Sequence, residues 1–314
     1  DAVIGLVVGV DRGRYTCLVS APGDGPGAGS ERIVVAMKAR ELGRTRVVVG
    51  DRVALVGETS GRPDTLARIV RVEERTSVLR RTADDSDPVE RVIVANADQL
   101  VIVTALCDPE PRPRMIDRCL VAAYDAGLEP LLALTKADLV DPHAFVSTYA
   151  PLDVDYVVTA REGAEIHGLD ELRGRLSGHI SVLVGHSGVG KSTLVNALVP
   201  GADRVTGEVN DVTGRGRHTS TNAVALRLPD DTGWVIDTPG VRSFGLAHID
   251  PDRIVDHFPE LARGTEECPR GCTHDEPDCA LDAWVAAGHA GPAGPARLES
   301  LRRLLESRSA AEEW

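Results

Sequence analysis

Short apolar runs separated by turn residues characterise the first 80 residues of the chain. Each run is rich in Val and Ile, and Gly, Asp and Arg fill the gaps, a pattern typical of β-strands joined by hairpins and loops. Five short strands in the first 72 residues predict a small closed barrel, and the OB-fold is the barrel most often used to bind nucleic acid. The runs lie at 2–10, 15–19, 32–36, 47–49 with 51–56, and 67–72.

A different pattern begins after a charged, polar stretch at 73–90, which has no periodicity and is predicted to be a linker. From 92 to 240, continuous apolar runs alternate with helical patterns such as the one at 115–127, which a glycine closes. Buried strands alternating with helices predict an α/β fold with a mostly parallel sheet and helices on both faces. The apolar runs lie at 92–96, 99–104, 130–134, 157–160, 180–184 and 234–237.

The C-terminal part is predicted to be mainly helical, with segments at 251–263, 280–287 and 296–306. The last segment repeats its apolar positions at i, i+3, i+4 and i+7, which is typical of a packing face rather than a membrane anchor. The sequence contains no run of 18 apolar residues and does not open with a secretory leader pattern, so neither a membrane span nor secretion is expected. The predicted domains are 1–80, 90–245 and 246–314.

Residues 185–192 match the phosphate-binding pattern G-x-x-x-x-G-K-[ST] between a predicted strand and a predicted helix. The glycines allow backbone N–H groups to turn toward phosphate oxygens, and the helix N-terminus adds a partial positive charge. In this pattern Lys191 reaches the β- and γ-phosphates, and Ser192 ligates Mg²⁺. A Gly-rich turn without a ligand is the alternative, but strand, loop, Lys-Ser and helix occur here in the required order. The predicted phosphate-binding residues are Gly185, His186, Ser187, Gly188, Val189, Gly190, Lys191, Ser192 and Thr193.

Three further motifs are similar to those with which GTPases recognise their nucleotide. Residues 135–138, Thr-Lys-Ala-Asp, resemble the [NT]-K-x-D motif, whose carboxylate accepts hydrogen bonds from the ring N–H and the exocyclic amine of guanine. The next motif, at 159–160, resembles the strand end whose backbone N–H contacts the guanine oxygen. Residues 237–240 resemble D-x-x-G, in which Asp237 holds Mg²⁺ through a water and the Gly240 N–H senses the γ-phosphate. The predicted guanine-binding residues are Thr135, Lys136, Ala137, Asp138, Thr159 and Ala160.

The order of these motifs is a circular permutation of the usual one. Ordinary GTPases begin with the phosphate loop and end with the guanine motifs, whereas here both guanine motifs come first. Natural termini often lie close together on the surface, so such a permutation is tolerated. With this order the chain resembles, over essentially its whole length, the RsgA (YjeQ) family of circularly permuted GTPases of small-ribosomal-subunit assembly. The resemblance implies an N-terminal OB-fold, a central permuted G domain and a C-terminal zinc-binding module.

The resemblance also implies a function. It predicts a ribosome-dependent GTPase of late small-subunit maturation, a cytoplasmic monomer that binds rRNA through its OB-fold and zinc module and hydrolyses GTP to GDP to drive release. Its ligands would be GTP or GDP, Mg²⁺ and one structural Zn²⁺, and neither DNA nor a membrane is an expected partner. The alternative is an RNA- or protein-binding adaptor that senses GTP and GDP with little turnover. That alternative arises because Val241 stands where Ras-like enzymes place the Gln that orients the attacking water.

Residues 213–221, Thr-Gly-Arg-Gly-Arg-His-Thr-Ser-Thr, follow the phosphate loop and are expected to form switch I. Because an apolar Val241 cannot orient water, His218 is the candidate for that role, by position or as a base. The alternative is that His218 has no catalytic role and lies on a basic loop that contacts RNA or makes no contact. The family's H-T-T-T pattern is H-T-S-T here, so the Mg²⁺-binding hydroxyl of switch I is one of Thr219, Ser220 and Thr221. The predicted catalytic residues are Lys191, Ser192, His218, Asp237 and Gly240.

Three cysteines and one histidine lie within twelve residues near the C-terminus, and Pro and Gly turn the chain between them. Three thiolates and one imidazole form a tetrahedral ligand set for Zn²⁺, and four protein ligands indicate a structural site rather than a catalytic one. Two gaps between these ligands, x₃ and x₄, are each one residue shorter than is usual in the family. A redox pair or free thiols is the alternative. The predicted zinc ligands are Cys268, Cys272, His274 and Cys279.

Charge and the remaining cysteines add to this picture. Residues 1–80 contain thirteen Lys and Arg against ten Asp and Glu, a net charge of +3, although the whole chain carries −13. A basic region on an acidic protein is typical of local RNA contact, but a barrel with ordinary solvated arginines has the same composition. Cys17, Cys107 and Cys119 are scattered in apolar settings, which indicates reduced thiols in the cytoplasm.

Overall fold

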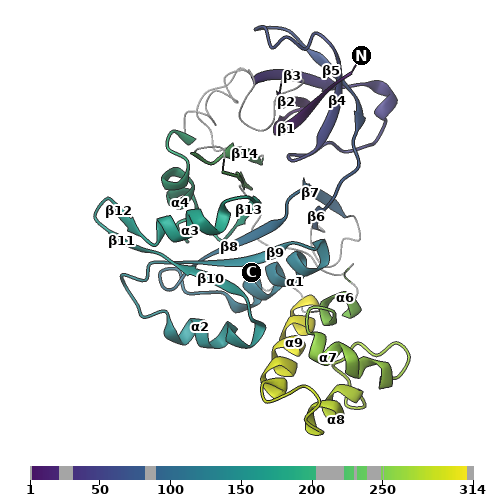
Figure 1. The fold of residues 1–314 in the computed structure, drawn as a ribbon, viewed down its shortest axis with the longest axis vertical. Coiled ribbons are helices and arrows are strands. Elements are labelled where there is room, and N and C mark those ends of the chain that lie inside the picture. The colour runs from purple at the N-terminus through teal and green to yellow at the C-terminus, as the bar shows by residue number, and fades with distance from the viewer. Residues whose placement is uncertain are drawn as a thin grey trace.

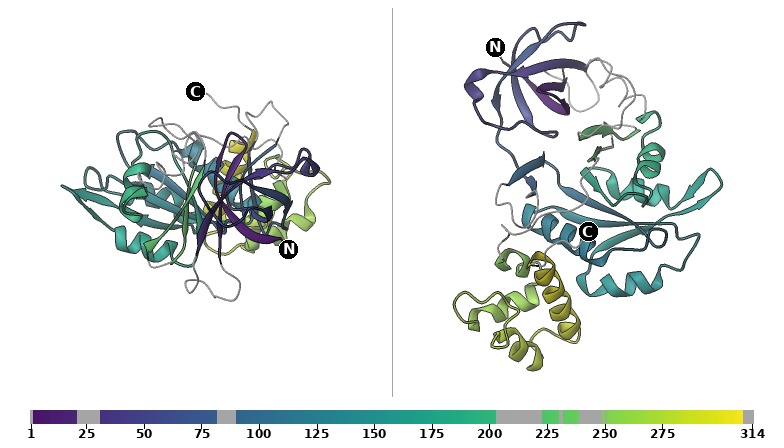
Figure 2. Two further views of the ribbon diagram at one scale, coloured as in Figure 1. Left: turned by 90° about the horizontal axis from the view of Figure 1, so that it is seen from above. Right: turned by 180° about the vertical axis from the view of Figure 1, so that it is seen from behind.

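The computed structural model describes residues 2–20, 31–81, 90–202, 223–229, 232–238, 249 and 251–309. Figure 1 shows three parts along the long axis: a small barrel of strands, a layered region of strands and helices, and a group of helices that contains the C-terminal helix. The view from behind in Figure 2 shows the same succession. No helix among these described residues is long and apolar enough to cross a membrane.

The N-terminal part is a closed β-barrel, which confirms the predicted class of this region. Its strands follow the order β1-β2-β3-β5-β4, and β4 pairs back on β1 to close the barrel. The core contains Val7, Cys17, Val34, Leu55 and Ile69, each fully buried. Residues 47–49 were expected to extend the fourth strand, but Val49 forms only an isolated bridge to Val94. The barrel strands are β1 Val3–Asp11, β2 Arg14–Val19, β3 Arg32–Lys38, β4 Arg52–Gly57 and β5 Ala67–Val72.

The central sheet is mostly parallel, as predicted. Its strands follow the order β10-β9-β8-β13-β15-β14, and all neighbours are parallel except the antiparallel pair of β15 with β14. The carboxyl ends of the five parallel strands therefore lie at one edge of the sheet, where ligands of open α/β sheets bind. The six strands of the central sheet, β14 included, are β8 Gln99–Ala105, β9 Glu129–Thr135, β10 Asp155–Val158, β13 Ile180–Val184, β14 Val224–Arg227 and β15 Trp234–Asp237.

Helices cover both faces of this sheet (Figure 1). Alternate residues of β8 face opposite sides, so Val101 and Val103 pack with α3 and α4, whereas Leu100 and Ile102 pack with α1. The helix expected at 115–127 is α1, which ends at Gly127 in the left-handed conformation that favours glycine. These helices are α1 Pro113–Ala126, α3 Leu169–Leu176 and α4 Lys191–Leu198.

The C-terminal helices share one hydrophobic core with the α1 face of the sheet. Phe258 and Leu301 are fully buried in the same cluster as Leu120 of α1. The helix expected at 251–263 is divided into α6 and α7, because Phe258 leaves helical geometry and packs into this core. The helices are α6 Pro251–Val255, α7 Pro259–Ala262, α8 Ala280–Ala286 and α9 Gly294–Ser309. The remaining short elements are η1 Arg40–Leu42, α2 His143–Tyr149, η2 Ala150–Leu152, β11 Ala160–Glu162, β12 Glu165–His167 and η4 Arg263–Glu267.

Polar anchors also hold α9 against α1. Arg118 donates to the carbonyl of Ser307 at 2.7 Å, and Arg303 Nε donates to Asp117 Oδ2 at 3.0 Å. Burial raises the pKa of Asp117 to about 6, and the nearby Arg303 guanidinium opposes this shift. A buried carboxylate that keeps an arginine partner fixes the relative position of the two helices. The C-terminal helices are therefore packed as an extension of the α/β region.

The described part of the linker predicted at 73–90 contains a β-strand. Within it, β6 (Val78–Arg81) pairs with β7 (Arg91–Ala95), and Leu79 joins the core beneath α1. Gly50 has φ +90°, and a Cβ at this position would lie 1.9 Å from the carbonyl oxygen of Ala95. The Asn96 amide donates to the Gly50 carbonyl at 2.8 Å. Only glycine allows the barrel backbone to approach the sheet this closely.

Candidate nucleotide site and metal centre

The phosphate loop connects the carboxyl end of β13 to the first turn of α4, as the sequence predicts. Gly188 and Gly190 have φ values of +84° and +92°, which an L side chain rarely adopts. A Cβ on Gly185 would lie 2.6 Å from the carbonyl oxygen of Val103, so this position also requires glycine. Val189 is buried beneath the loop, whereas Ser192 and Thr193 are exposed on the first helical turn. The loop therefore has the glycine-dependent shape that lets backbone N–H groups face a phosphate.

Two charged residues of the predicted site meet beside this loop. In the parallel register of β13 and β15, Leu183 stands opposite Asp237, so Asp237 ends its strand next to the start of the loop. The ammonium group of Lys191 forms an ion pair with the Asp237 carboxylate. The neighbouring Thr238 is buried and donates to the carbonyl of Leu183 at 2.8 Å, which fixes the end of β15. The groups expected to contact phosphate and Mg²⁺ thus lie together.

The guanine motif is joined to the phosphate loop by a direct hydrogen bond. Thr135 ends β9, and its hydroxyl donates to the carbonyl of Val189 at 2.6 Å. Thr159 directly follows the adjacent strand β10, and its N–H donates to the Leu134 carbonyl at 2.7 Å. The Ala137 N–H in turn donates to the Thr159 carbonyl at 3.2 Å. These bonds place the two guanine segments side by side at the same sheet edge as the loop.

A cavity of about 240 Å³ opens between these segments. Asp138 is exposed beside it, and its Oδ1 accepts a hydrogen bond from the backbone N–H of Arg161 at 2.9 Å. The ammonium group of Lys136 is held by the carbonyl of Asp108 in the loop after β8. The cavity is lined by Thr135, Lys136, Asp138, Leu139, Thr159, Ala160, Arg161, Ile166, Gly190, Thr193 and Leu194.

Sequence reasoning missed four residues of this cavity, namely Leu139, Arg161, Ile166 and Leu194. Arg161 and Ile166 belong to a tight hairpin, β11–β12, whose two-residue loop contains Gly163 at φ +61°. A glycine between short alternating runs is a hairpin signal that could have found them. The switch I candidates and the end of the D-x-x-G motif lie outside the described residues. Those residues are His218, Thr219, Ser220, Thr221 and Gly240.

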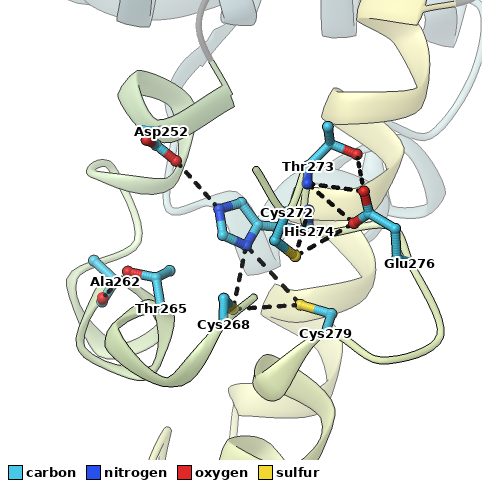
Figure 3. A network of polar contacts seen from close by, with 9 residues as sticks. All are labelled: Asp252, Ala262, Thr265, Cys268, Cys272, Thr273, His274, Glu276 and Cys279. Carbon is cyan, nitrogen blue, oxygen red and sulfur yellow. Dashed lines mark hydrogen bonds and ion pairs between the residues drawn. The ribbon is translucent and has the colours of Figure 1, made fainter. Parts of the chain in front are cut away.

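The four predicted zinc ligands converge on one point (Figure 3). Each offers one ligand atom, and these atoms lie within 4.8 Å of one another. Cys268 Sγ is 3.7 Å from His274 Nδ1 and 3.9 Å from Cys279 Sγ. A tetrahedral zinc with bonds of about 2.0–2.3 Å holds its ligand atoms about 3.5–3.8 Å apart, so the cluster has nearly the dimensions of such a site. The shortened gaps in the sequence do not prevent the ligands from meeting.

The surroundings of His274 also fit a metal ligand. The imidazole is buried, and its Nε2 lies 3.3 Å from the Asp252 carboxylate of α6, which leaves Nδ1 directed at the cysteines (Figure 3). A carboxylate behind a ligating histidine orients the ring and selects its tautomer. Asp252 stands 22 residues before His274, and spacing rules for zinc ligands do not extend to such outer partners, so sequence reasoning missed it.

Burial opposes the ionisation of the three thiols. Burial raises the pKa of the Cys272 thiol to about 11, and burial is also the main cause that raises the pKa values of Cys268 and Cys279. A bound Zn²⁺ would deprotonate such thiols outright. Glu276 lies on the solvent side, with Oε2 3.3 Å from Cys272 Sγ. Hydrogen bonds from Thr273 lower the pKa of Glu276 to about 2.

Comparison with known proteins agrees with this geometry. The family model described as RsgA GTPase matches residues 72–247. The chain belongs to the RsgA GTPase family. It is 37% identical over 318 residues to the small ribosomal subunit biogenesis GTPase RsgA of Chlorobaculum parvum, a match that covers 98% of each chain. It is 45% identical over 224 residues to the protein of that name from Pseudomonas aeruginosa, which covers 68% of this chain and 64% of the relative.

Two solved structures of RsgA-like proteins share the fold over nearly the whole chain. YjeQ from Thermotoga maritima superimposes with a TM-score of 0.68 at 26% identity and covers 99% of this chain and 100% of its own. YloQ, described as a circularly permuted GTPase, superimposes with a TM-score of 0.65 at 21% identity, and the match covers 98% and 96%. The order of motifs predicted a circular permutation, and YloQ, which has the same fold, is described as circularly permuted.

The cluster of Cys268, Cys272, His274 and Cys279 leads to a direct prediction. We expect the purified protein to contain one zinc ion per chain and Cys272→Ser to lose most of it, because a hydroxyl does not replace a thiolate ligand. Zinc content measured by atomic emission tests this expectation. Cys107→Ser, the same change in the half-buried thiol after β8, is the matched control and should keep its zinc. Equal zinc in the two variants would contradict the assigned ligand set.

Proposed function

We propose that this chain hydrolyses GTP to GDP during late maturation of the small ribosomal subunit. The observation that carries the proposal is a single cavity shared by the two halves of a nucleotide site. Asp138 lines it together with Gly190 and Thr193, and Lys191, which pairs with Asp237, directly follows Gly190 in the chain. The names of the relatives, small ribosomal subunit biogenesis GTPases, support the assignment to this process.

Each residue of the site has a role that its chemistry supports. Asp138 would accept from the ring N–H and the exocyclic amine of guanine, and the Ala160 N–H would donate to the guanine oxygen. Lys191 would move from Asp237 to the β- and γ-phosphates. The Ser192 hydroxyl and the Asp237 carboxylate are the oxygen donors that Mg²⁺ prefers, so they would hold that ion. Bound there, Mg²⁺ would supply positive charge to the phosphates.

The proposal extends to the partner and to the other two parts of the chain. The closed strand order β1-β2-β3-β5-β4 supports an OB-fold, and the net positive charge of residues 1–80 suits contact with rRNA. A structural Zn²⁺ at Cys268, Cys272, His274 and Cys279 would shape the second rRNA-contacting surface. In this proposal the chain has three domains, at 1–80, 90–245 and 246–314. The protein would act as a monomer in the cytoplasm. Hydrolysis to GDP would then promote release from the subunit.

The water-activating residue is assigned from the sequence. Val241 follows the D-x-x-G motif and cannot orient a water molecule, so we propose His218 for this role, with a hydroxyl of Thr219, Ser220 or Thr221 on Mg²⁺. The same Val241 supports the second candidate function. Without an efficient water-positioning group, the protein would act as a GTP- or GDP-sensing adaptor with little turnover.

GTP turnover measured with and without purified small ribosomal subunits distinguishes these functions. We expect small subunits to increase the rate at least tenfold, and large subunits, the control particle, to leave it unchanged. Nucleotide-dependent binding to small subunits without stimulated turnover would favour the adaptor. Equal stimulation by both particles would contradict a role specific to the small subunit.

A further inference from the structure

The cavity that Asp138 lines, called the guanine cavity below, is lined in part by the hairpin β11–β12. This hairpin projects from the end of β10 (Figure 1). Its two strands pair antiparallel, with Arg161 opposite Ile166 and Glu162 opposite Glu165. Side chains that stand opposite each other share one face of a hairpin, and their neighbours share the other. Arg161 and Ile166 therefore occupy one face. The ion pair between His167 Nε2 and Glu162 Oε2, 3.0 Å apart, lies on the other face.

The face with Arg161 and Ile166 lines the cavity that also contains Asp138 and Lys136. Ile166 is half-buried and packs against the core on the α3 and α4 side of the sheet. The Arg161 side chain is exposed, but its Nε donates to the carbonyl of Gly163 at 2.9 Å, which restrains the guanidinium against the hairpin turn. The cavity wall formed by this hairpin thus combines an apolar branched side chain with a planar cation.

The hairpin is held rigidly at its base. Gly168, directly after β12, has φ +80°, and a Cβ there would lie 2.1 Å from the carbonyl oxygen of Val158. Only glycine lets the returning strand pass this close to the end of β10. The backbone N–H of Arg161 donates to Asp138 Oδ1 at 2.9 Å, which ties the outgoing strand to the guanine motif. The position of the hairpin is therefore fixed relative to both guanine segments.

We propose that the β11–β12 hairpin is a wall of the base-binding site, in which the Arg161 guanidinium and the Ile166 side chain hold the flat face of the purine. A guanidinium plane stacks on an aromatic face, and a branched apolar side chain excludes water from it. The Arg161 N–H positions the Asp138 carboxylate that reads the base edge. This inference rests on the proposed function, because it assigns further residues to the same nucleotide site.

The two kinds of contact are separable by experiment. A stacking residue contributes to the affinity for any purine that the site admits, whereas Asp138 distinguishes guanine by its exocyclic amine. Inosine diphosphate lacks that amine and is otherwise identical to GDP. We expect Arg161→Ala to weaken binding of GDP and inosine diphosphate by the same factor, on the order of tenfold. Arg161→Lys should fall between the parent and Arg161→Ala, because it keeps the charge but not the plane.

Dissociation constants from calorimetry on the full chain would test the proposal. Ile166→Ala is the second cavity-facing variant and should also weaken both nucleotides equally, while Glu162→Ala, on the opposite face, is the matched control and should bind as the parent does. GDP affinity within twofold of the parent in both Arg161→Ala and Ile166→Ala would overturn the proposal. So would a loss restricted to GDP. A parent chain that binds no guanine nucleotide would instead refute the proposed function.

Discussion

Replacing Asp138 with asparagine is expected to exchange guanine for xanthine as the preferred base. The carboxylate offers two acceptors to the ring N–H and the exocyclic amine, whereas an amide offers one acceptor and one donor. The donor meets the amine of guanine unfavourably but suits the carbonyl that xanthine carries at the same position. Sites built on such hydrogen bonds discriminate by about 10⁴–10⁵, so the ratio of GTP to XTP turnover should fall by about three orders of magnitude or more. Competition for turnover between the two nucleotides measures this ratio.

The chain offers a matched control for this change. Asp141 is also exposed, accepts a backbone hydrogen bond at 2.8 Å from His143, and lies outside the guanine cavity. Asp141→Asn should leave the preference for GTP unchanged. XTP turnover by Asp138→Asn shows in addition that this variant is folded and that its phosphate site is intact. Unchanged GTP affinity in Asp138→Asn would contradict the assignment of residues 135–138 to the base.

Replacing Lys191 with alanine is expected to lower GTP turnover by about 10²–10³. The ammonium group lies where the phosphate loop meets Asp237, so it is placed to stabilise charge that develops on the transferred phosphoryl group. The fold should persist, because the side chain faces the site rather than either core of the sheet. Single-turnover hydrolysis of GTP by the full chain, with and without small subunits, measures the loss.

Lys38 in the barrel provides the control for this substitution. Its ammonium group donates to the nearby carbonyls of Gly43 and Thr45, at 2.8 and 2.9 Å. Lys38→Ala should therefore keep the intrinsic rate of GTP hydrolysis measured without ribosomal subunits. Retained hydrolysis in Lys191→Ala would remove the assignment of residues 185–192 to phosphate binding.

The chemistry of the candidate site could be predicted because its residues act through local patterns. Gly188 and Gly190 adopt backbone conformations that only glycine tolerates well, so the loop is marked by glycine spacing together with Lys191. Thr135 ends a buried strand and Asp138 comes three residues later, and parallel strands bring their carboxyl ends to one edge. The predicted zinc ligands lie within twelve residues, so short-range spacing alone can bring them around one ion.

Other features depend on contacts between residues that are distant in the sequence. Asp252 lies beside the His274 imidazole only because α6 packs next to the cysteine–histidine cluster. No local sequence pattern predicts this contact. Leu79 sits in a stretch that reads as a linker, yet it becomes a strand residue because β7 and α1 cover it. Residues 47–49 have strand composition, but their β-pairing is limited to one isolated bridge, between Val49 and Val94, so they form no strand. Tertiary packing outweighs local propensity at each of these places.

The sequence by itself determined the order of the motifs and the three-part division of the pattern, and it predicted the nucleotide and zinc ligands from their chemistry. Those properties follow from residue type and short-range spacing, which do not depend on how the three parts of the chain pack together. Only the tertiary structure decided that Phe258 and Leu301 share a core with α1, and that Arg161 and Ile166 face the base cavity. The burial of apolar surface does not depend on chain distance, so which surfaces come together is settled by the fold as a whole.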